Sequence, residues 1–106
     1  MKSELHAKGV RLTNRLRTFI EDRIRFTTGR FHSRIQRLRV RLVDVNGPRG
    51  GEDIQCHVHA SLGRAGTVTI KETCQDPYAA VARAIERAGR QLSRRLSRRS
   101  AGRRGR

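Results

Sequence analysis

Hydrophobic and polar residues alternate along several stretches of the chain, and this alternation predicts β-strands. In the most regular stretch, Leu38, Val40 and Leu42 alternate with arginines, so the strand has one apolar face and one basic face. Glycine-rich segments at residues 46–51 and 63–66 are predicted to be loops, the second one a tight hairpin. The predicted strands cover residues 3–8, 35–45, 53–62 and 67–72.

Two other segments repeat their apolar residues with the period of an amphipathic helix. The first follows Thr13, a good N-cap residue, and is ended by a glycine, after which Phe31 is expected to fold back onto the core. The second covers residues 76–99, with Asp76 as the N-cap and Pro77 at the first helical position. Its predicted packing stripe consists of Tyr78, Val81, Ile85, Ala88, Leu92 and Leu96.

The predicted element order is β-α-β-β-β-α. The helix after the first strand makes a crossover, so strands one and two should be parallel, and the others can form an antiparallel meander. Each helix has one apolar stripe and each strand one apolar face. The predicted fold class is therefore α+β, a two-layer sandwich with a four-stranded sheet and both helices on one face. The other face is left open and carries Arg37, Arg39, Arg41, His57 and His59.

A chain of 106 residues is long enough for one modest core. Residues 1–99 are predicted to form one domain, and residues 100–106 a basic disordered tail. The sequence shows no secretory segment and no apolar stretch of membrane-spanning length, so a cytoplasmic protein is expected, with its two cysteines as free thiols.

The formal net charge of +16 points first to nucleic acid and second to an anionic membrane surface. Arginines repeat along the second helix at spacings where like charges destabilise a helix, and only Glu86 offers relief within it. Such a row is explained by an anionic partner, contacted mostly through its phosphates; the alternative is a solvated charged face. The row consists of Arg83, Arg87, Arg90, Arg94 and Arg98, continued by Arg95.

The arginines that point outward from the second strand are a weaker candidate for RNA contact, because outward charges can simply prevent aggregation of sheets. Cys56, His57, His59 and Cys74 suggest a metal site, but strand alternation turns Cys56 to the core and both histidines away from it, and Cys74 is expected past the fourth strand. No metal site and no cofactor are predicted. Because no phosphate-binding loop or nucleophile–base arrangement is present, no enzymatic activity is predicted either.

The segment DPYAAVARAIERAGRQLSRRL resembles the final helix of the ribosome hibernation-promoting factors, also called ribosome-associated translation inhibitors or sigma-54 modulation proteins. The first helix, opened by Leu12-Thr13 and closed by Glu21-Asp22-Arg23-Ile24, is similar as well, and the resemblance covers about residues 3–97. The matching residues of the final helix are Asp76, Tyr78, Ala80, Val81, Ile85, Arg90, Gln91 and Leu92.

The resemblance implies a ribosome hibernation factor that binds rRNA in the mRNA/tRNA channel of the small ribosomal subunit and inhibits translation under stress or in stationary phase. It implies no small-molecule substrate and no membrane partner. Long members carry a second domain that pairs ribosomes; these 106 residues do not include one, so a monomer off the ribosome is expected. The implied RNA contacts are Arg87, Arg90 and Arg94 on the final helix and Arg23 on the first, with Arg25 and Arg30 near basic positions of the family.

Two alternatives remain at this stage. One is a general binder of structured or double-stranded RNA that is not tied to translation arrest, since a helix-on-sheet layout also occurs in double-stranded RNA-binding modules. The other is a regulator that contacts a protein partner, as the name sigma-54 modulation protein suggests.

Overall fold

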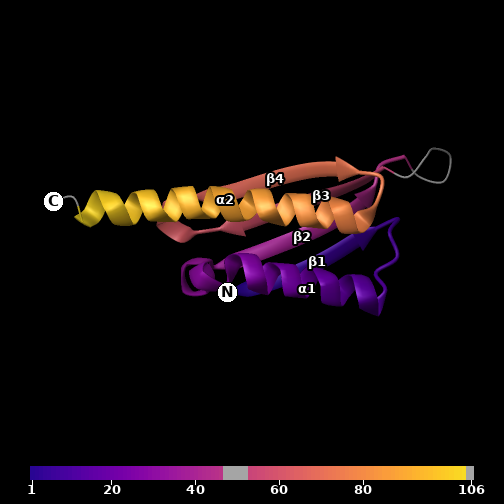
Figure 1. Ribbon diagram of the computed structural model, residues 1–106, viewed down its shortest axis with the longest axis horizontal. Helices are drawn as coiled ribbons and strands as arrows, with labels where there is room; N and C mark the ends of the chain where they lie inside the picture. Colours follow the sequence, from indigo (N-terminus) through magenta and orange to yellow (C-terminus); the bar gives the residue numbers. More distant parts are fainter. Residues whose placement is uncertain (47–52, 105–106) are drawn as a thin grey trace.

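The computed structural model describes the backbone of residues 1–46 and 53–104, and the side chains of these residues as far as Ser97. The order of elements is the predicted one (Figure 1). The elements are β1 (Lys2–Lys8), α1 (Asn14–Thr28), the 3-10 helix η1 (Gly29–Arg34), β2 (Arg37–Asp44), β3 (Ile54–Ser61), the 3-10 turn η3 (Gly63–Ala65), β4 (Thr67–Cys74) and α2 (Pro77–Arg104).

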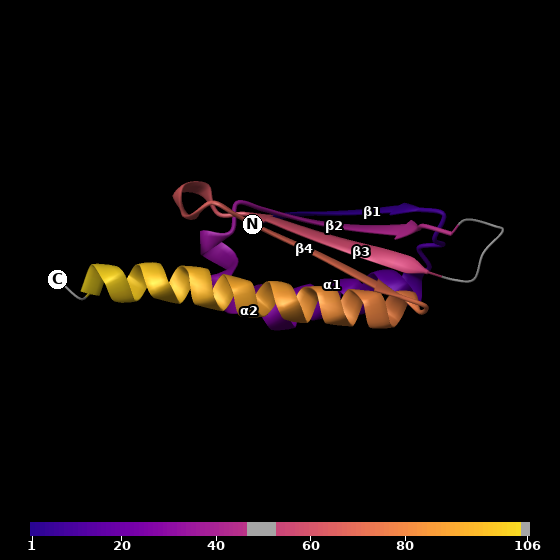
Figure 2. The same ribbon diagram turned by 90° about the horizontal axis from the view of Figure 1, so that it is seen from above.

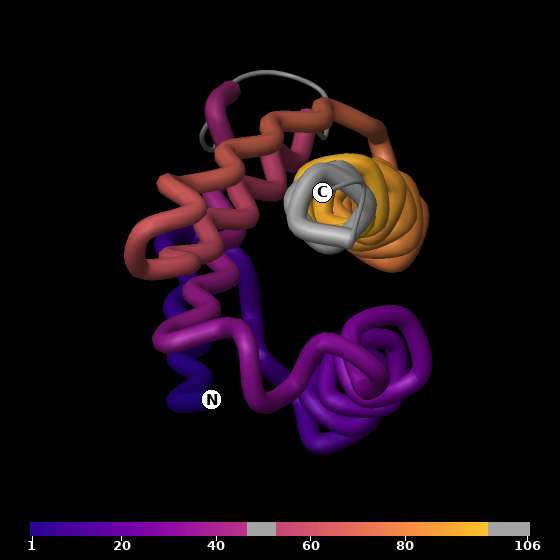
Figure 3. The backbone as a smooth tube through the Cα atoms, turned by 90° about the vertical axis from the view of Figure 1, so that its left-hand side faces the viewer, coloured from indigo at the N-terminus to yellow at the C-terminus, as the bar shows by residue number. Residues whose placement is uncertain are grey.

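The strands form one sheet in the order β1-β2-β3-β4. The pair β1–β2 is parallel, and the pairs β2–β3 and β3–β4 are antiparallel, so the predicted crossover and meander are confirmed. Seen from above, α1 and α2 lie on the same side of the sheet, and the end-on view shows the resulting two layers (Figures 2 and 3). Both views also show that no described element covers the opposite face of the sheet.

The core forms where the two helices meet the sheet. Leu16, Ile20 and Ile24 of α1 are buried, as is the predicted packing stripe of α2 apart from the half-buried Tyr78. Phe31 folds back onto this core as expected and is 8% exposed. The helix starts agree with their predicted caps: Thr13 Oγ1 accepts a hydrogen bond from the Leu16 N–H at 3.1 Å, and Asp76 Oδ1 accepts one from the Tyr78 N–H at 3.3 Å.

The helices α1 and α2 pack closely together at a glycine. A Cβ atom on Gly89 would lie 2.4 Å from Cγ2 of Thr27, well inside van der Waals contact. Nearer the start of both helices, Phe19 and Tyr78 pack edge to face with ring centroids 5.0 Å apart. A glycine in a helix interior costs stability by itself, and here it allows the two backbones to pack side by side.

The ends of two elements differ from the prediction. Cys74 is the last residue of β4, because the ladder with β3 continues to Ile54, whereas the sequence placed it beyond the strand. The helix α2 runs to Arg104 and projects past the sheet, whereas the ordered domain was expected to end at residue 99 (Figure 1). Ala101, Arg103 and Arg104 favour helix, whereas Gly102 between them disfavours it. Residues 105–106 and most of the predicted 46–51 loop lie outside the described residues.

Candidate nucleic-acid interface

The helix α2 presents its arginines to solvent because its apolar stripe is used up against the sheet and α1. Arg83, Arg87, Arg90 and Arg94 are all exposed. Within the part of the chain whose side chains the structure describes, Arg83 and Arg94 have no hydrogen bond and no ion pair. Their guanidinium groups, which can grip a phosphate with two parallel bonds, are therefore available to a partner.

Arg87 and Arg90 have carboxylate partners within the protein. Arg90 Nη1 lies 3.0 Å from Glu86 Oε1, the internal relief expected from the sequence. Arg87 Nη1 lies 2.5 Å from Glu72 Oε2 and donates to the Lys71 carbonyl at 3.3 Å. These pairs are solvent-exposed and therefore weak, so a phosphate can compete for both arginines.

Arg95 is held differently from Arg94 although the two are adjacent in sequence. It is half-buried, and its Nη1 donates hydrogen bonds to the carbonyl oxygens of Ala65 at 3.0 Å and Thr67 at 3.2 Å. These bonds fasten α2 to the connection between β3 and β4 and turn the guanidinium away from the exposed row. The side chain of Arg98, another predicted contact, lies outside the described residues.

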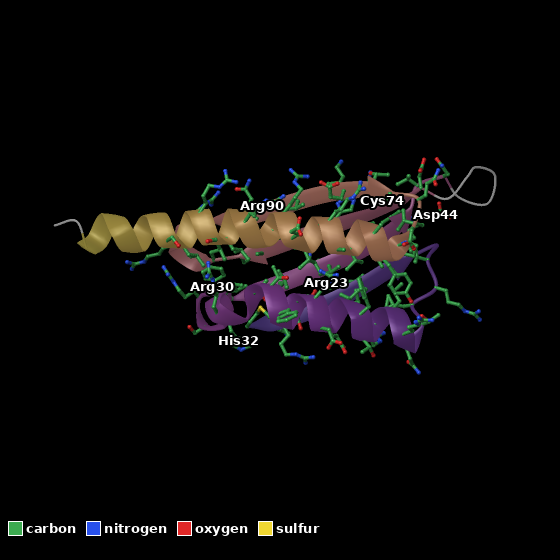
Figure 4. All side chains as sticks on the ribbon, in the orientation of Figure 1. Arg23, Arg30, His32, Asp44, Cys74 and Arg90 are labelled. Carbon is green, nitrogen blue, oxygen red and sulfur yellow. The ribbon has the colours of Figure 1, made fainter. Side chains whose placement is uncertain are left out.

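The structure brings two of the three arginines predicted in and after the first helix beside α2: Arg23 of α1 and Arg30 of η1 (Figure 4). Arg30 Nη2 donates to Ser93 Oγ at 3.0 Å, and its guanidinium lies 4.7 Å from the centre of the Phe31 ring. Arg23 lies 5.2 Å over the ring of Phe19, which itself packs against α2. Stacking on a ring fixes a guanidinium plane while leaving its N–H groups free to donate. We call Arg23, Arg30, Arg83, Arg90 and Arg94 the helix-pair arginines.

Arg25 is not part of this group. It is exposed and pairs with Asp22, and two residues along a helix turn its side chain about 200° away from Arg23. Phe26 lies beside this pair and is 92% exposed. It was not singled out from the sequence. The signal was present, since Phe26 falls off the apolar stripe of α1. An exposed ring between charged side chains can stack on an unpaired base.

The chemistry of the cysteines and histidines argues against a reactive or metal-binding centre here. Cys56 faces the helices, whereas His57 points to the opposite face of the sheet. Burial, followed by the neighbouring Cys74, raises the pKa of the Cys56 thiol to about 12, so it stays protonated and is a poor nucleophile. Among the side chains that the structure describes, no group of three or more His, Cys, Asp or Glu residues could hold a metal ion.

None of the helices in the described part of the chain combines the length and the apolar character needed to cross a bilayer. The helix-pair arginines form a basic surface, and two of them, Arg83 and Arg94, have no partner among the described side chains. Such a surface is chemically suited to binding phosphate.

Comparison with known proteins agrees with this geometry. The chain is similar over 89% of its length to the crystal structure of the Protein Y N-terminal domain from Thermus thermophilus, covering 98% of that chain with a TM-score of 0.72 and 22% identity. It also resembles a ribosomal subunit interface protein from Coxiella burnetii, with a TM-score of 0.73, 16% identity, and coverage of 92% of this chain and 99% of the other. At these identities the likeness establishes the fold. No curated protein sequence matches the chain significantly.

The resemblance inferred from the helix motifs is confirmed by a family model that matches residues 4–100, nearly the whole chain. The protein therefore belongs to the Sigma 54 modulation protein / S30EA ribosomal protein family.

Proposed function

We propose that this protein is a ribosome hibernation factor, which binds rRNA in the mRNA/tRNA channel of the small ribosomal subunit and inhibits translation under stress or in stationary phase. The observation that carries the proposal is the row of exposed arginines across α1 and α2, in which Arg83 and Arg94 have no partner among the described side chains. Membership of the family, and a structural relative named a ribosomal subunit interface protein, support the ribosome as the partner.

The arrangement suits RNA that is read through its shape and phosphates. The helix-pair arginines can neutralise several phosphates, and each contact releases condensed counterions, so binding should weaken steeply as salt rises. Base-specific readout is not needed for a protein that blocks a channel, since occupancy alone excludes mRNA and tRNA. The proposed protein is accordingly a cytoplasmic, non-catalytic binder without a cofactor, monomeric when it is off the ribosome.

Sedimentation with ribosomal subunits at increasing salt, together with translation in vitro, tests the proposal. Charge reversal of both unpaired arginines, Arg83→Glu with Arg94→Glu, should abolish cosedimentation and relieve inhibition. The control is Arg17→Glu with Arg64→Glu, which makes the same change of charge at exposed positions outside the helix-pair arginines. The proposal fails if the wild-type protein stays in the supernatant at low salt, or if both variants bind equally.

Competition separates channel blocking from general RNA binding. A protein that occupies the mRNA/tRNA channel should be displaced from ribosomes by excess tRNA or mRNA, whereas a general binder of structured RNA on the ribosome periphery should remain bound. A regulator that acts on a protein partner would instead give a complex that survives nuclease treatment.

A further inference from the structure

A row of basic side chains crosses the uncovered face of the sheet, with one residue from each strand. The strand registers pair His6 with Arg41, Arg41 with His57, and His57 with Lys71. Three of these side chains are exposed and His57 is half-buried. Neighbouring strands lie about 4.8 Å apart, so the four groups are direct neighbours. We call them the cross-strand row.

Arg41 and Lys71 carry the permanent positive charges of this row, and the strand registers place His57 between them. Positive charge on both sides makes protonation of this histidine unfavourable. Partial burial, followed by Lys71 and Arg41, lowers the pKa of His57 below its ordinary value of 6.5, so the histidine is held neutral by its own neighbourhood. The row thus carries two permanent positive charges, Arg41 and Lys71, with a neutral histidine between them.

Among the described strand residues, a single carboxylate lies on this face. The strand registers place Glu4 there, 3.3 Å from Arg39 and 3.5 Å from Arg37, with His6 at 3.4 Å. The bond from His6, followed by the two arginines, lowers the pKa of Glu4 below its usual value. Glu72 pairs with Arg87 of α2, on the other side of the sheet. On the four described strands, therefore, one acid is set against the cross-strand row and the arginines of β2.

We propose that the open sheet face is a second RNA-binding surface, which takes the phosphate backbone of an RNA segment along the cross-strand row. The proposal rests on the proposed function and extends it: the domain would be held between two RNA surfaces, with the helix-pair arginines against one and the sheet against the other. Thr67 and Thr69 of β4 have short side chains that project little from the sheet beside the row, and their hydroxyl groups add hydrogen-bond donors.

The competing explanation is that outward charges only prevent sheets from stacking. That purpose is served equally well by mixed charges, which would attract across the strands instead of repelling. Arg37, Arg39, Arg41 and Lys71 on one face, with a single acid among the described strand residues there, are instead complementary to a polyanion.

The test compares two variants of equal charge change, Arg41→Gln with Lys71→Gln on the sheet and Arg83→Gln with Arg94→Gln on α2, in ribosome binding over about 50 to 200 mM salt. Each double variant should make the slope of the logarithm of the binding constant against log salt shallower by about 2, because each residue contacts about one phosphate. The sheet pair should also raise the melting temperature slightly, since it reduces the net positive charge of the folded protein.

If the α2 double variant loses ribosome binding and the sheet double variant binds like the wild-type protein, this inference is overturned and the proposed function stands. Unchanged binding in both pairs would refute the proposed function as well. Glu4→Gln provides a test of opposite sign, because it removes the one acid that the described strands place on this face. The variant should bind several-fold more tightly and with a steeper salt slope; weaker or equal binding of a folded variant counts against the proposal.

The chemical class of the partner is read out by a photo-crosslinking benzoylphenylalanine at Thr69, an exposed position of β4 that is paired with His59 beside the cross-strand row. On purified ribosomes it should crosslink to rRNA. A crosslink only to ribosomal protein, or no crosslink under conditions where the same probe at Glu86 of α2 gives one, would show that the sheet face does not contact RNA.

Discussion

Replacing Gly89 by alanine tests how closely α1 and α2 pack, which determines how the helix-pair arginines are spaced. The new Cβ would lie 2.4 Å from Cγ2 of Thr27, whereas carbon atoms pack at about 3.5–4.0 Å. Overlap of this kind in a packed contact costs about 1–3 kcal/mol, while alanine gains about 1 kcal/mol over glycine as a helix former. The net effect of Gly89→Ala is expected to be a loss of stability of up to about 2 kcal/mol.

The control is the same substitution at Gly29, where no atom lies within 4 Å of the added Cβ and the backbone is helical at φ −55° and ψ −41°. Gly29→Ala should stabilise the protein by about 0.4–1 kcal/mol, mainly by restricting the unfolded chain. Urea unfolding measures both variants, and a shift in midpoint without a change in slope reports stability alone. The two identical substitutions should therefore have effects of opposite sign.

Thr27→Ser removes the clashing methyl group and keeps the hydroxyl. In that background Gly89→Ala should no longer destabilise, which gives a coupling energy of about 1–3 kcal/mol in the double-mutant cycle. If Gly89→Ala is as stabilising as Gly29→Ala in the wild-type protein, or if the cycle shows no coupling, then α1 and α2 do not meet at this position and the reasoning is wrong.

Three further predictions follow from the contacts of single residues. Arg95→Ala should lower stability by about 1–2 kcal/mol in a thermal melt, because two carbonyl groups lose a charged donor. Arg94→Ala should instead leave stability unchanged and weaken ribosome binding. Equal melting temperatures of the two variants would contradict this. Burial and basic neighbours lower the pKa of His57 in the folded state. Its contribution to stability is therefore fully present above about pH 6.5 and is lost as the pH falls towards its folded pKa. His57→Gln should remove this pH dependence from unfolding curves recorded across the range. With a pKa of about 12, Cys56 should resist iodoacetamide in the folded protein while the half-buried Cys74 is alkylated. Mass spectrometry of the labelled peptides measures both rates, and equal rates would disprove the prediction.

Much of the fold could be read from the sequence because periodicity encodes which side of an element is buried. The alternation around Leu38, Val40 and Leu42 gave the inward face of β2, and all three side chains are buried. The stripe on α2 was predicted in the same way, and its outward arginines follow from it. Lys71 and His6 were missed as members of the cross-strand row, although alternation in their strands already turned them outward, because the row exists only once the strands are in register.

The sequence by itself determined the elements, their order, the common side for both helices and the strongly basic character of the surface. These properties depend on local spacing and on charge, which need no knowledge of distant neighbours. Only the tertiary structure decided which arginines are free. Helical periodicity already turns Arg95 about 100° from Arg94, but only the fold shows that Arg94 faces solvent while Arg95 holds a turn 28 to 30 residues away.

The same holds for Gly89, which in sequence is only a weak helix residue and in the fold is the point of contact with Thr27. Partners far apart in the chain are brought together by strand register and helix packing. These long-range contacts satisfy Arg87 with Glu72 and leave Arg83 exposed without a partner among the described side chains. The physical reason is that charge is a property of a residue, whereas its availability depends on what the fold places beside it.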